Sequence, residues 1–211
     1  NSVTLTNANG WHIDGEAVAR DTGIARIRLV NDLQTMAWGV TALEPGEWMT
    51  LHAGTPYREG NAALIAPGTG LGEALLHRVD GRLIPSPSEG GHADFAPRTA
   101  REIALLEFIT DRFGRASYEH VLSGPGLVTL HRFTHAHRCS VVDPDAPGAP
   151  ALITAAGLAG TCTACVEVLG MFVELLGAEA GNLALRSVAT SGLFVGGGIS
   201  AKIRPALQDG R

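Results

Sequence analysis

The sequence contains very little lysine and few aromatic residues. Lys202 is the only lysine among 211 residues, and aromatic residues make up 5% of the chain. Proteins that bind nucleic acid usually carry clustered Lys and Arg, whereas this chain has a net charge of −5 at pH 7. We therefore expect no nucleic-acid partner. The glycine run at 67–72 is not followed by lysine, which also excludes a P-loop.

Cysteine and uninterrupted apolar sequence are scarce as well. The chain has three cysteines, Cys139, Cys162 and Cys165, and no recognisable targeting segment. An odd number of cysteines in such a chain indicates reduced thiols and a cytoplasmic location. The longest apolar region, 151–199, predicts buried elements and no membrane span. Charged residues interrupt it at Glu167, Glu174, Glu179 and Arg186.

Glycine and proline, in contrast, are abundant, with 27 and 11 residues, and 45% of the chain is hydrophobic. This composition is typical of a globular α/β protein with many tight turns. The length allows one large domain or two small ones. The irregular segment 43–58 is interpreted as a link between two lobes, because it contains two prolines and two glycines. The chain begins with asparagine and not with methionine, so we interpret it as a fragment of a longer protein.

Two polar residues lie at a predicted junction between a strand and a helix. Residues 24–30 alternate between two sets of side chains, which predicts a strand. The following apolar residues have helical spacing: Leu33, Met36, Ala37 and Val40. Asn31 and Asp32 stand between the two elements, where open α/β sheets bind their ligands. The alternative is that Asp32 only caps the helix.

A second polar motif is Glu89-Gly90-Gly91-His92. Glycine lets another group approach the backbone closely and allows a positive φ. A carboxylate accepts two hydrogen bonds, and a neutral imidazole offers one donor and one acceptor. Together they suit a small polyhydroxylated ligand, although a polar turn facing water would have the same sequence. Glu119, taken alone, has the sequence context of an ordinary exposed glutamate.

Two glycine turns follow predicted strands. The turn at 67–72 lies between a strand at 62–66 and a β-hairpin at 73–85, so it opens no helix and is not a dinucleotide motif. Its amides and the Thr69 hydroxyl could form a nest for phosphate oxygens. The second turn, 196–198, lies between a strand and a helix that Ser200 would cap, where a nucleotide can approach the backbone. Either turn could instead serve packing alone.

Further apolar patterns predict helices at 99–113, 127–138 and 182–187. The first has its expected apolar face at Ile103, Leu106, Ile109 and Phe113. Gly-Pro-Gly at 124–126 predicts a sharp turn before the second helix, and Gly181 predicts a break before the third.

Histidine and cysteine invite a metal-binding interpretation, which we do not favour. His131, His135, His137 and Cys139 form H-x3-H-x-H-x-C, and the first two share a helix face. No acidic cluster or glycine turn accompanies them. Cys162 and Cys165 form a single CxxC without a second pair, so they are interpreted as small apolar residues of a helix. We expect no metal site. A metal-binding structural protein that uses His131, His135 and His137 is the weakest alternative.

Taken in order, these motifs resemble those of the bacterial ATP-dependent glucokinase family, within the hexokinase/actin-like ATPase superfamily. The specific strings are Glu-Gly-Gly-His-x-Asp-Phe-Ala-Pro at 89–97 and Leu-Ser-Gly-Pro-Gly-Leu at 122–127. The resemblance implies an α/β, two-lobed actin-like ATPase (ribonuclease H-like) fold, truncated at both ends. Residues 1–42 would be a remnant of the small lobe that carries Asp32, and residues 43–211 the large lobe. The family's N-terminal Asp-x-Gly-Gly-Thr loop and C-terminal helix are missing.

The resemblance also implies a function, which is transfer of the γ-phosphate of ATP to the 6-hydroxyl of D-glucose, with Mg²⁺ accompanying ATP. Asp32 would be the general base. The sugar hydroxyls would be held by Asn31, Asp32, Glu89, His92 and Glu119. The phosphates would be bound by Gly68, Thr69 and Gly70, and the adenosine by Gly196, Gly197 and Gly198. The full-length protein would be a homodimer. The alternatives are a kinase for another hexose and a non-catalytic sugar-binding module.

Overall fold

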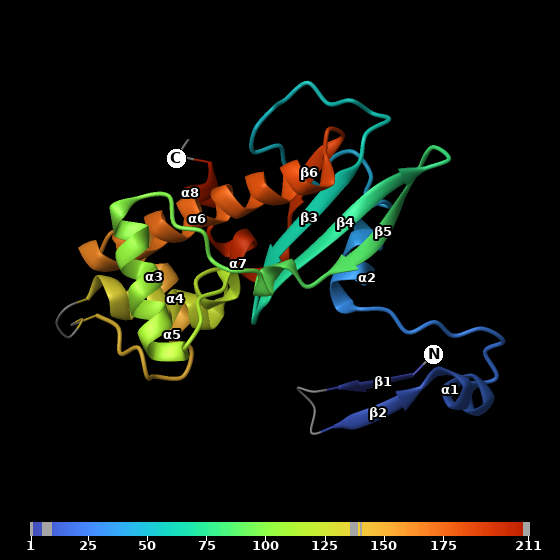
Figure 1. The fold of residues 1–211 in the computed structure, drawn as a ribbon, viewed down its shortest axis with the longest axis horizontal. Helices are drawn as coiled ribbons and strands as arrows, with labels where there is room; N and C mark the ends of the chain where they lie inside the picture. The colour runs from blue at the N-terminus through green and yellow to red at the C-terminus, as the bar shows by residue number, and fades with distance from the viewer. Residues whose placement is uncertain (1, 6–9, 136–138, 140, 209–211) are drawn as a thin grey trace.

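A four-stranded mixed sheet forms the centre of the protein (Figure 1). The structure is a computed structural model that describes the chain except residues 1, 6–9, 136–138, 140 and 209–211. The strand order is β5-β4-β3-β6. The antiparallel strands are β3 (Ala62–Pro67), β4 (Leu71–Val79) and β5 (Arg82–Ser88), and β6 (Gly192–Val195) pairs parallel to β3. The predicted strand at 62–66 and the predicted hairpin are thereby confirmed.

Both faces of the sheet are covered by helices. The helix α2 (Asp32–Val40) packs on β4 and β5, and the long helix α6 (Thr163–Ser187) packs on β3 and β4. Strand β3 is therefore buried at every position. Its side chains alternate, with Ala63 and Ile65 in the core on the α6 side and Ala62 and Leu64 in the core on the α2 side.

The larger core lies among the helices on the α6 side of the sheet. They are α3 (Ala100–Phe113), α4 (Gly124–Thr134), α5 (Ala149–Ala159), α6, α7 (Gly197–Lys202) and α8 (Arg204–Leu207). Two short 3₁₀ helices lie in the connections: η1 (Gly90–His92) between β5 and α3, and η2 (Tyr118–His120) between α3 and α4. Among the described helices α6 is long and apolar enough to cross a membrane, but 56% of its most apolar window is buried inside the protein, as in the core helix of a soluble domain.

The N-terminal segment forms a small unit of its own. Strands β1 (Ser2–Leu5) and β2 (Trp11–Asp14) pair antiparallel, and α1 (Gly15–Thr22) follows directly. Asp14 caps α1 by accepting hydrogen bonds from the amides of Glu16 and Ala17, and Gly23 ends the helix at φ +72°. In Figure 1 this unit lies to one side of the central sheet.

The predicted strand at 24–30 is wrong. Within the described residues this segment belongs to no strand, and the small sheet pairs β1 with β2. Alternating side chains define two faces, but they do not by themselves specify a strand, because strand formation also depends on the long-range context of the segment. The expectation that Asn31 and Asp32 follow a strand end therefore fails, and their position is set by the packing of α2 instead.

Four other sequence expectations about helices are corrected. Helix α6 continues through Gly181, because packing of its buried face outweighs the cost of about 1 kcal/mol for one glycine. Gly124 to Gly126 form the first turn of α4, with Ser123 as the cap. Ser200 lies inside α7, and Gly196 occupies the cap position. The buried apolar side chains of α3 are Leu105 and Ile109, whereas Ile103 and Phe113 are exposed.

Candidate active site

The two 3₁₀ helices that carry the sugar-binding candidates are held side by side by backbone pairing. Asp94 forms an antiparallel bridge with Ser117, and the Tyr118 amide donates to the Ala93 carbonyl at 3.1 Å. Arg115 strengthens the junction, because its guanidinium bonds both the Asp94 carboxylate and the carbonyl of His92. The turn at 89–92 and Glu119, which are distant in the sequence, thereby face each other.

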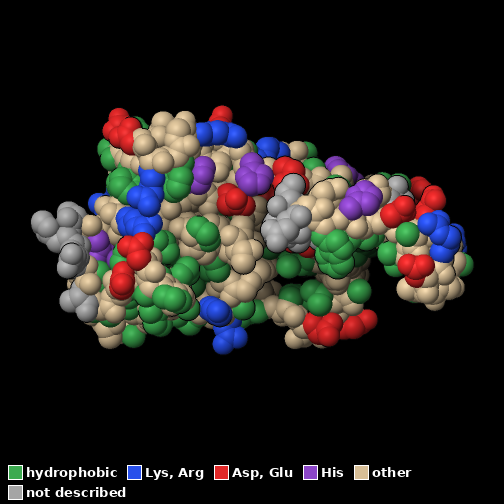
Figure 2. Space-filling view, turned by 90° about the horizontal axis from the view of Figure 1, so that it is seen from below, with side chains coloured by type: hydrophobic (Ala, Val, Ile, Leu, Met, Phe, Trp, Pro, Cys, Tyr) green, Lys and Arg blue, Asp and Glu red, His purple; other side chains and the backbone are tan. Residues whose placement is uncertain are grey.

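Three of the predicted sugar-binding side chains meet at this junction. His92 Nε2 lies 3.9 Å from Glu89 Oε2, and His92 Nδ1 lies 3.7 Å from Glu119 Oε1. The side chains of His92 and Glu89 are 58% and 78% exposed, and that of Glu119 is 33% exposed. On the face shown in Figure 2, acidic and histidine side chains gather near the middle of the molecule. The group is therefore open to a ligand from solvent.

The two glycines of this motif make room for the protein's own atoms. A Cβ on Gly90 would lie 2.1 Å from Glu73 Oε2, and a Cβ on Gly91 would lie 2.1 Å from the Leu71 carbonyl oxygen. Neither glycine has a positive φ. The close approach expected at this motif thus exists, but it comes from strand β4 and fixes the position of the turn.

The predicted phosphate turn, residues 68–70, connects β3 to β4 directly beside Glu119. The Leu71 amide donates to Glu119 Oε2 at 2.9 Å. The Gly68 amide is used inside the turn, where it donates to the Gly70 carbonyl at 2.8 Å, and the Gly68 carbonyl accepts from the Gly124 amide. Among the described residues, the amides of Thr69 and Gly70 are left without an acceptor. The turn can therefore offer these two amides and the exposed Thr69 hydroxyl to a phosphate.

Asn31 and Asp32 lie at the first turn of α2. Asn31 is the cap, since its Oδ1 accepts from the amides of Leu33 and Gln34, and Asp32 Oδ1 accepts from Leu33 at 2.9 Å. The Leu33 side chain fills the space that Gly72 leaves, only 2.2 Å from where a Cβ would be. The first turn of α2 therefore packs on the start of β4 at Gly72. The preceding residue, Leu71, is the one whose amide bonds Glu119. Capping is shared by both residues and leaves one Asp32 oxygen available.

The predicted adenosine turn lies against the phosphate turn. The Gly196 amide donates to the Ile65 carbonyl at 2.8 Å, which extends the parallel ladder by one residue. Gly197 has φ +84°, and a Cβ there would lie 2.3 Å from the Pro67 carbonyl oxygen. Position 197 therefore requires glycine, both for its positive φ and for the lack of space for a side chain. Gly198 has open space around it.

Sequence reasoning missed a buried ionic group behind the sugar-binding candidates. Glu73 on β4 and Glu179 on α6 are fully buried, and Arg186 bonds both carboxylates. Burial, followed by the charge of Glu179, raises the pKa of Glu73 to about 7. Asn182 links Glu179 to the Tyr118 hydroxyl with two hydrogen bonds of 3.0 Å. The available signal was a glutamate flanked by small apolar residues, Glu73 between Gly72 and Ala74 and Glu179 between Ala178 and Ala180.

Comparison with known proteins assigns the chain to a family. A sequence model described as glucokinase matches residues 1–211. The chain belongs to the glucokinase family. Glucokinase from Chromobacterium violaceum is 39% identical over 202 residues, covering 95% of this chain and 57% of that protein. Glucokinase from Nostoc sp. is 34% identical over 230 residues, covering 99% of this chain and 66% of that protein. The chain thus spans between about half and two thirds of these relatives.

Solved structures of glucokinases share the fold. A glucokinase from an Antarctic psychrotroph matches with a TM-score of 0.81 at 29% identity, over 95% of this chain and 61% of that one. Glucokinase from Balamuthia mandrillaris, solved with glucose, matches with a TM-score of 0.74 at 19% identity over 98% and 64%. A Streptomyces griseus glucokinase of the ROK family, solved with glucose and AMPPNP, matches with a TM-score of 0.59 at 21% identity. The match covers 89% of this chain and 57% of that one. The fold is that of actin-like ATPases, as the sequence predicted.

Proposed function

We propose that the full-length protein is a glucokinase, which transfers the γ-phosphoryl group of ATP to the 6-hydroxyl of glucose. One observation carries the proposal. The Glu89, His92 and Glu119 side chains meet at one exposed junction, and Glu119 is bonded to the first residue after the phosphate turn. A sugar held by these side chains would lie next to the phosphates of a nucleotide. Membership in the glucokinase family supports the same reaction.

The sugar contacts follow from the chemistry of the donors. A glucose hydroxyl that donates to Glu89 or Glu119 forms a charge-assisted hydrogen bond, and each such bond contributes roughly 1.5–3 kcal/mol. His92 can donate or accept beside both carboxylates. A sugar with one hydroxyl inverted would leave a carboxylate unpaired, which gives selectivity among epimers. Asn31 completes the proposed set.

Asp32 would accept the proton of the sugar 6-hydroxyl as phosphoryl transfer proceeds. General bases contribute on the order of 10²–10⁴-fold to such reactions, and the rest of the catalysis is positioning and charge stabilisation. The phosphates would be held by Gly68, Thr69 and Gly70, where the amides of the last two are available. The adenosine would lie on Gly196 to Gly198. Mg²⁺ would accompany ATP and supply charge stabilisation.

A coupled assay on the full-length protein tests this proposal. Glucose 6-phosphate formation is measured with ATP and glucose, mannose or N-acetylglucosamine in parallel. Glucose should have the highest kcat/KM. Preference for another hexose would contradict glucokinase activity and favour the first alternative, a kinase for that hexose. Glucose binding without turnover would favour the second alternative, a non-catalytic sugar-binding module.

The cellular setting and the assembly are also proposals. We expect a cytoplasmic protein, since its substrates are intracellular metabolites, and a homodimer when full length. Light scattering of the purified full-length protein measures the mass directly, and a monomer at working concentration would contradict the dimer.

A further inference from the structure

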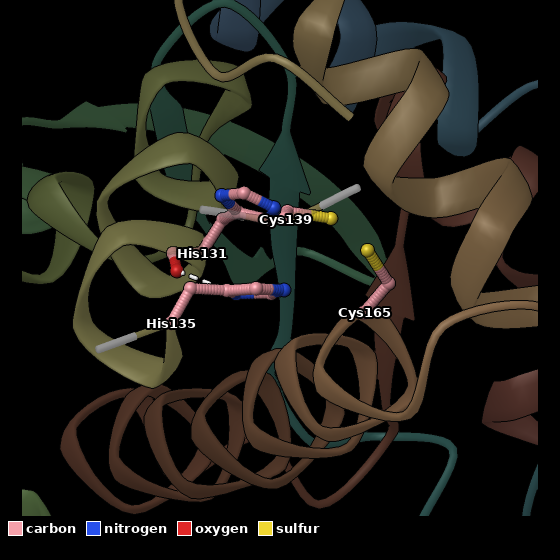
Figure 3. Close-up of side chains that lie close together, drawn as sticks. All are labelled: His131, His135, Cys139 and Cys165. Atoms are coloured by element: carbon pink, nitrogen blue, oxygen red, sulfur yellow. Dashed lines mark hydrogen bonds between the residues drawn. The ribbon is translucent and has the colours of Figure 1, made fainter. Parts of the chain in front are cut away.

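A group of histidines and cysteines lies at the far end of α4 from the phosphate turn. His131, His135, Cys139 and Cys165 each place one ligand atom within 4.8 Å of all the others. Figure 3 shows the two imidazoles, stacked on α4, with their nitrogens and the two sulfurs directed toward one common space. The sequence suggested His137 as the third member, but that residue lies outside the described part of the chain.

His131 is an unpartnered polar group in the core. It is 2% exposed, and both ring nitrogens are buried without a hydrogen-bond partner among the described residues. Leaving a buried polar group unpaired destabilises the folded protein. Such a group calls for an explanation, and ligation of a metal ion is one of the few available.

The neighbouring side chains are already oriented as metal ligands are. His135 Nδ1 lies 2.8 Å from the His131 carbonyl, to which it can donate, so that Nε2 faces the cysteine sulfurs. The Val142 amide donates to Cys139 Sγ at 3.3 Å. Ligating histidines and thiolates usually have such outer partners, which fix the ring orientation and stabilise the charge.

We propose that His131, His135, Cys139 and Cys165 bind one zinc ion. Two imidazoles and two thiolates form a common ligand set for tetrahedral structural zinc. Zinc–nitrogen and zinc–sulfur bonds of about 2.0–2.3 Å require ligand atoms roughly 3.3–3.8 Å apart. The four atoms, within 4.8 Å of one another, need to move inward by only a small amount. The bound ion satisfies a His131 nitrogen.

The ion would join the end of α4 to the start of α6. His131 and His135 lie in the last turn and at the cap of α4, Cys165 lies in the first turn of α6, and Cys139 belongs to the connection from α4 to α5. A zinc ion bound there would cross-link the end of α4, the connection after it and the start of α6, and so would stabilise the folded state. It lies outside the proposed sugar and nucleotide site, so its main effect is on stability.

Cys162 is the competing ligand. Its sulfur lies 3.8 Å from Cys139 Sγ and 3.6 Å from His135 Nε2. It is the cap residue of α6 and only partly buried, whereas Cys165 is fully buried. We therefore assign Cys165 as the ligand and leave Cys162 beside the site.

The test is zinc titration of the protein after chelator treatment, in the presence of a phosphine reductant. We expect one zinc per chain, a higher melting temperature with zinc, and a tetrahedral thiolate spectrum when cobalt replaces zinc. Cys165→Ser and Cys139→Ser should weaken zinc binding more than about 100-fold, since loss of an outer partner alone costs 10–100-fold. Cys162→Ser and the exposed His77→Gln should bind zinc as the unmodified protein does.

Several results would overturn the proposal. They are a stoichiometry well below one, an octahedral cobalt spectrum, and Cys139→Ser and Cys165→Ser variants that bind zinc normally. Loss of binding in Cys162→Ser with retention in Cys165→Ser would overturn the assigned ligand set. Circular dichroism of each variant without zinc separates lost ligation from lost folding. Cys139→Ser, at a partly exposed position, keeps the test decisive if the buried Cys165→Ser variant fails to fold.

Discussion

At the scale of single residues, Asn31 and Asp32 differ in how much they contribute to the cap of α2, which the sequence could not show. Asn31 accepts two helix amides, whereas Asp32 accepts one and keeps its second oxygen. Asn31 therefore contributes more of the cap, and one oxygen of the Asp32 carboxylate remains for the role of base that we propose. Replacing Asp32 should disturb turnover far more than folding.

We predict that Asp32→Asn in the full-length protein lowers kcat by about 10²–10⁴-fold, because the amide cannot accept the hydroxyl proton. Glucose binding, measured by calorimetry, should change little. The exposed Asp111→Asn on α3 is the matched control and should retain full activity. Near-normal turnover of Asp32→Asn would show that another group is the base.

Glu89→Gln should weaken glucose binding more than ATP binding. The neutral amide forms a weaker bond to a hydroxyl than the carboxylate does, so we expect a loss of roughly 1–2 kcal/mol, about five- to thirtyfold in affinity. Calorimetry with each ligand separately measures the two effects. Equal losses for both ligands would argue against a specific sugar contact.

At the scale of elements, the agreement between sequence and structure depends on whether a pattern is local. Helix α3 has its cap at Thr99 and its end at Gly114, both recognisable from the sequence. The β4–β5 hairpin is marked by Asp80-Gly81. Strand β5 runs on to Ser88 through two prolines, which is tolerated because β5 is the edge strand.

Elements whose existence depends on distant partners could not be predicted. Residues 24–30 have the alternation of a strand but are assigned to none of the described strands, and α6 continues through a glycine because of its packing. The proposed zinc ligands come from three segments that only the packing of α4 against α6 brings together. The sequence shows which residues could bind zinc, but it does not show that they lie close together.

The contact between the turn at 89–92 and β4 gives a prediction at this scale. Gly91→Ala would place a methyl group 2.1 Å from the Leu71 carbonyl oxygen, and a strand backbone cannot yield easily. We expect a loss of about 1–3 kcal/mol in the free energy of unfolding, measured by urea denaturation. Gly54→Ala, where nothing lies within 4 Å, should be nearly neutral. Equal stabilities would mean that the turn is free to move.

At the scale of the whole molecule, the buried ionic group ties the sheet to the helical layer behind the candidate active site. Glu73 comes from β4, while Glu179 and Arg186 come from α6. The same Glu73 oxygen that Arg186 bonds also lies against Gly90. The protonation of Glu73 therefore affects both the stability of the fold and the position of the turn at 89–92, which we propose to bind sugar.

Stability should depend on pH through Glu73. Its folded-state pKa of about 7 exceeds the ordinary value of 4.5. Its favourable contribution is thus complete below about pH 4.5 and is lost as the pH rises through 7. Glu73→Gln should become more stable relative to the unmodified protein between pH 5 and pH 8, by up to roughly 3 kcal/mol. Urea unfolding at both pH values checks this. The exposed Glu107→Gln is the control, and a pH-independent difference for Glu73→Gln would contradict the prediction.

The alternation of β3 has a consequence for how this chain can change length. One extra residue in β3 would invert the strand beyond it, exchanging the side chains that face α2 with those that face α6. The same shift would displace Pro67, whose carbonyl fits against Gly197. Insertions within β3 should therefore prevent the protein from folding. Insertions should be tolerated better in exposed segments outside the helices and strands, such as residues 43–58.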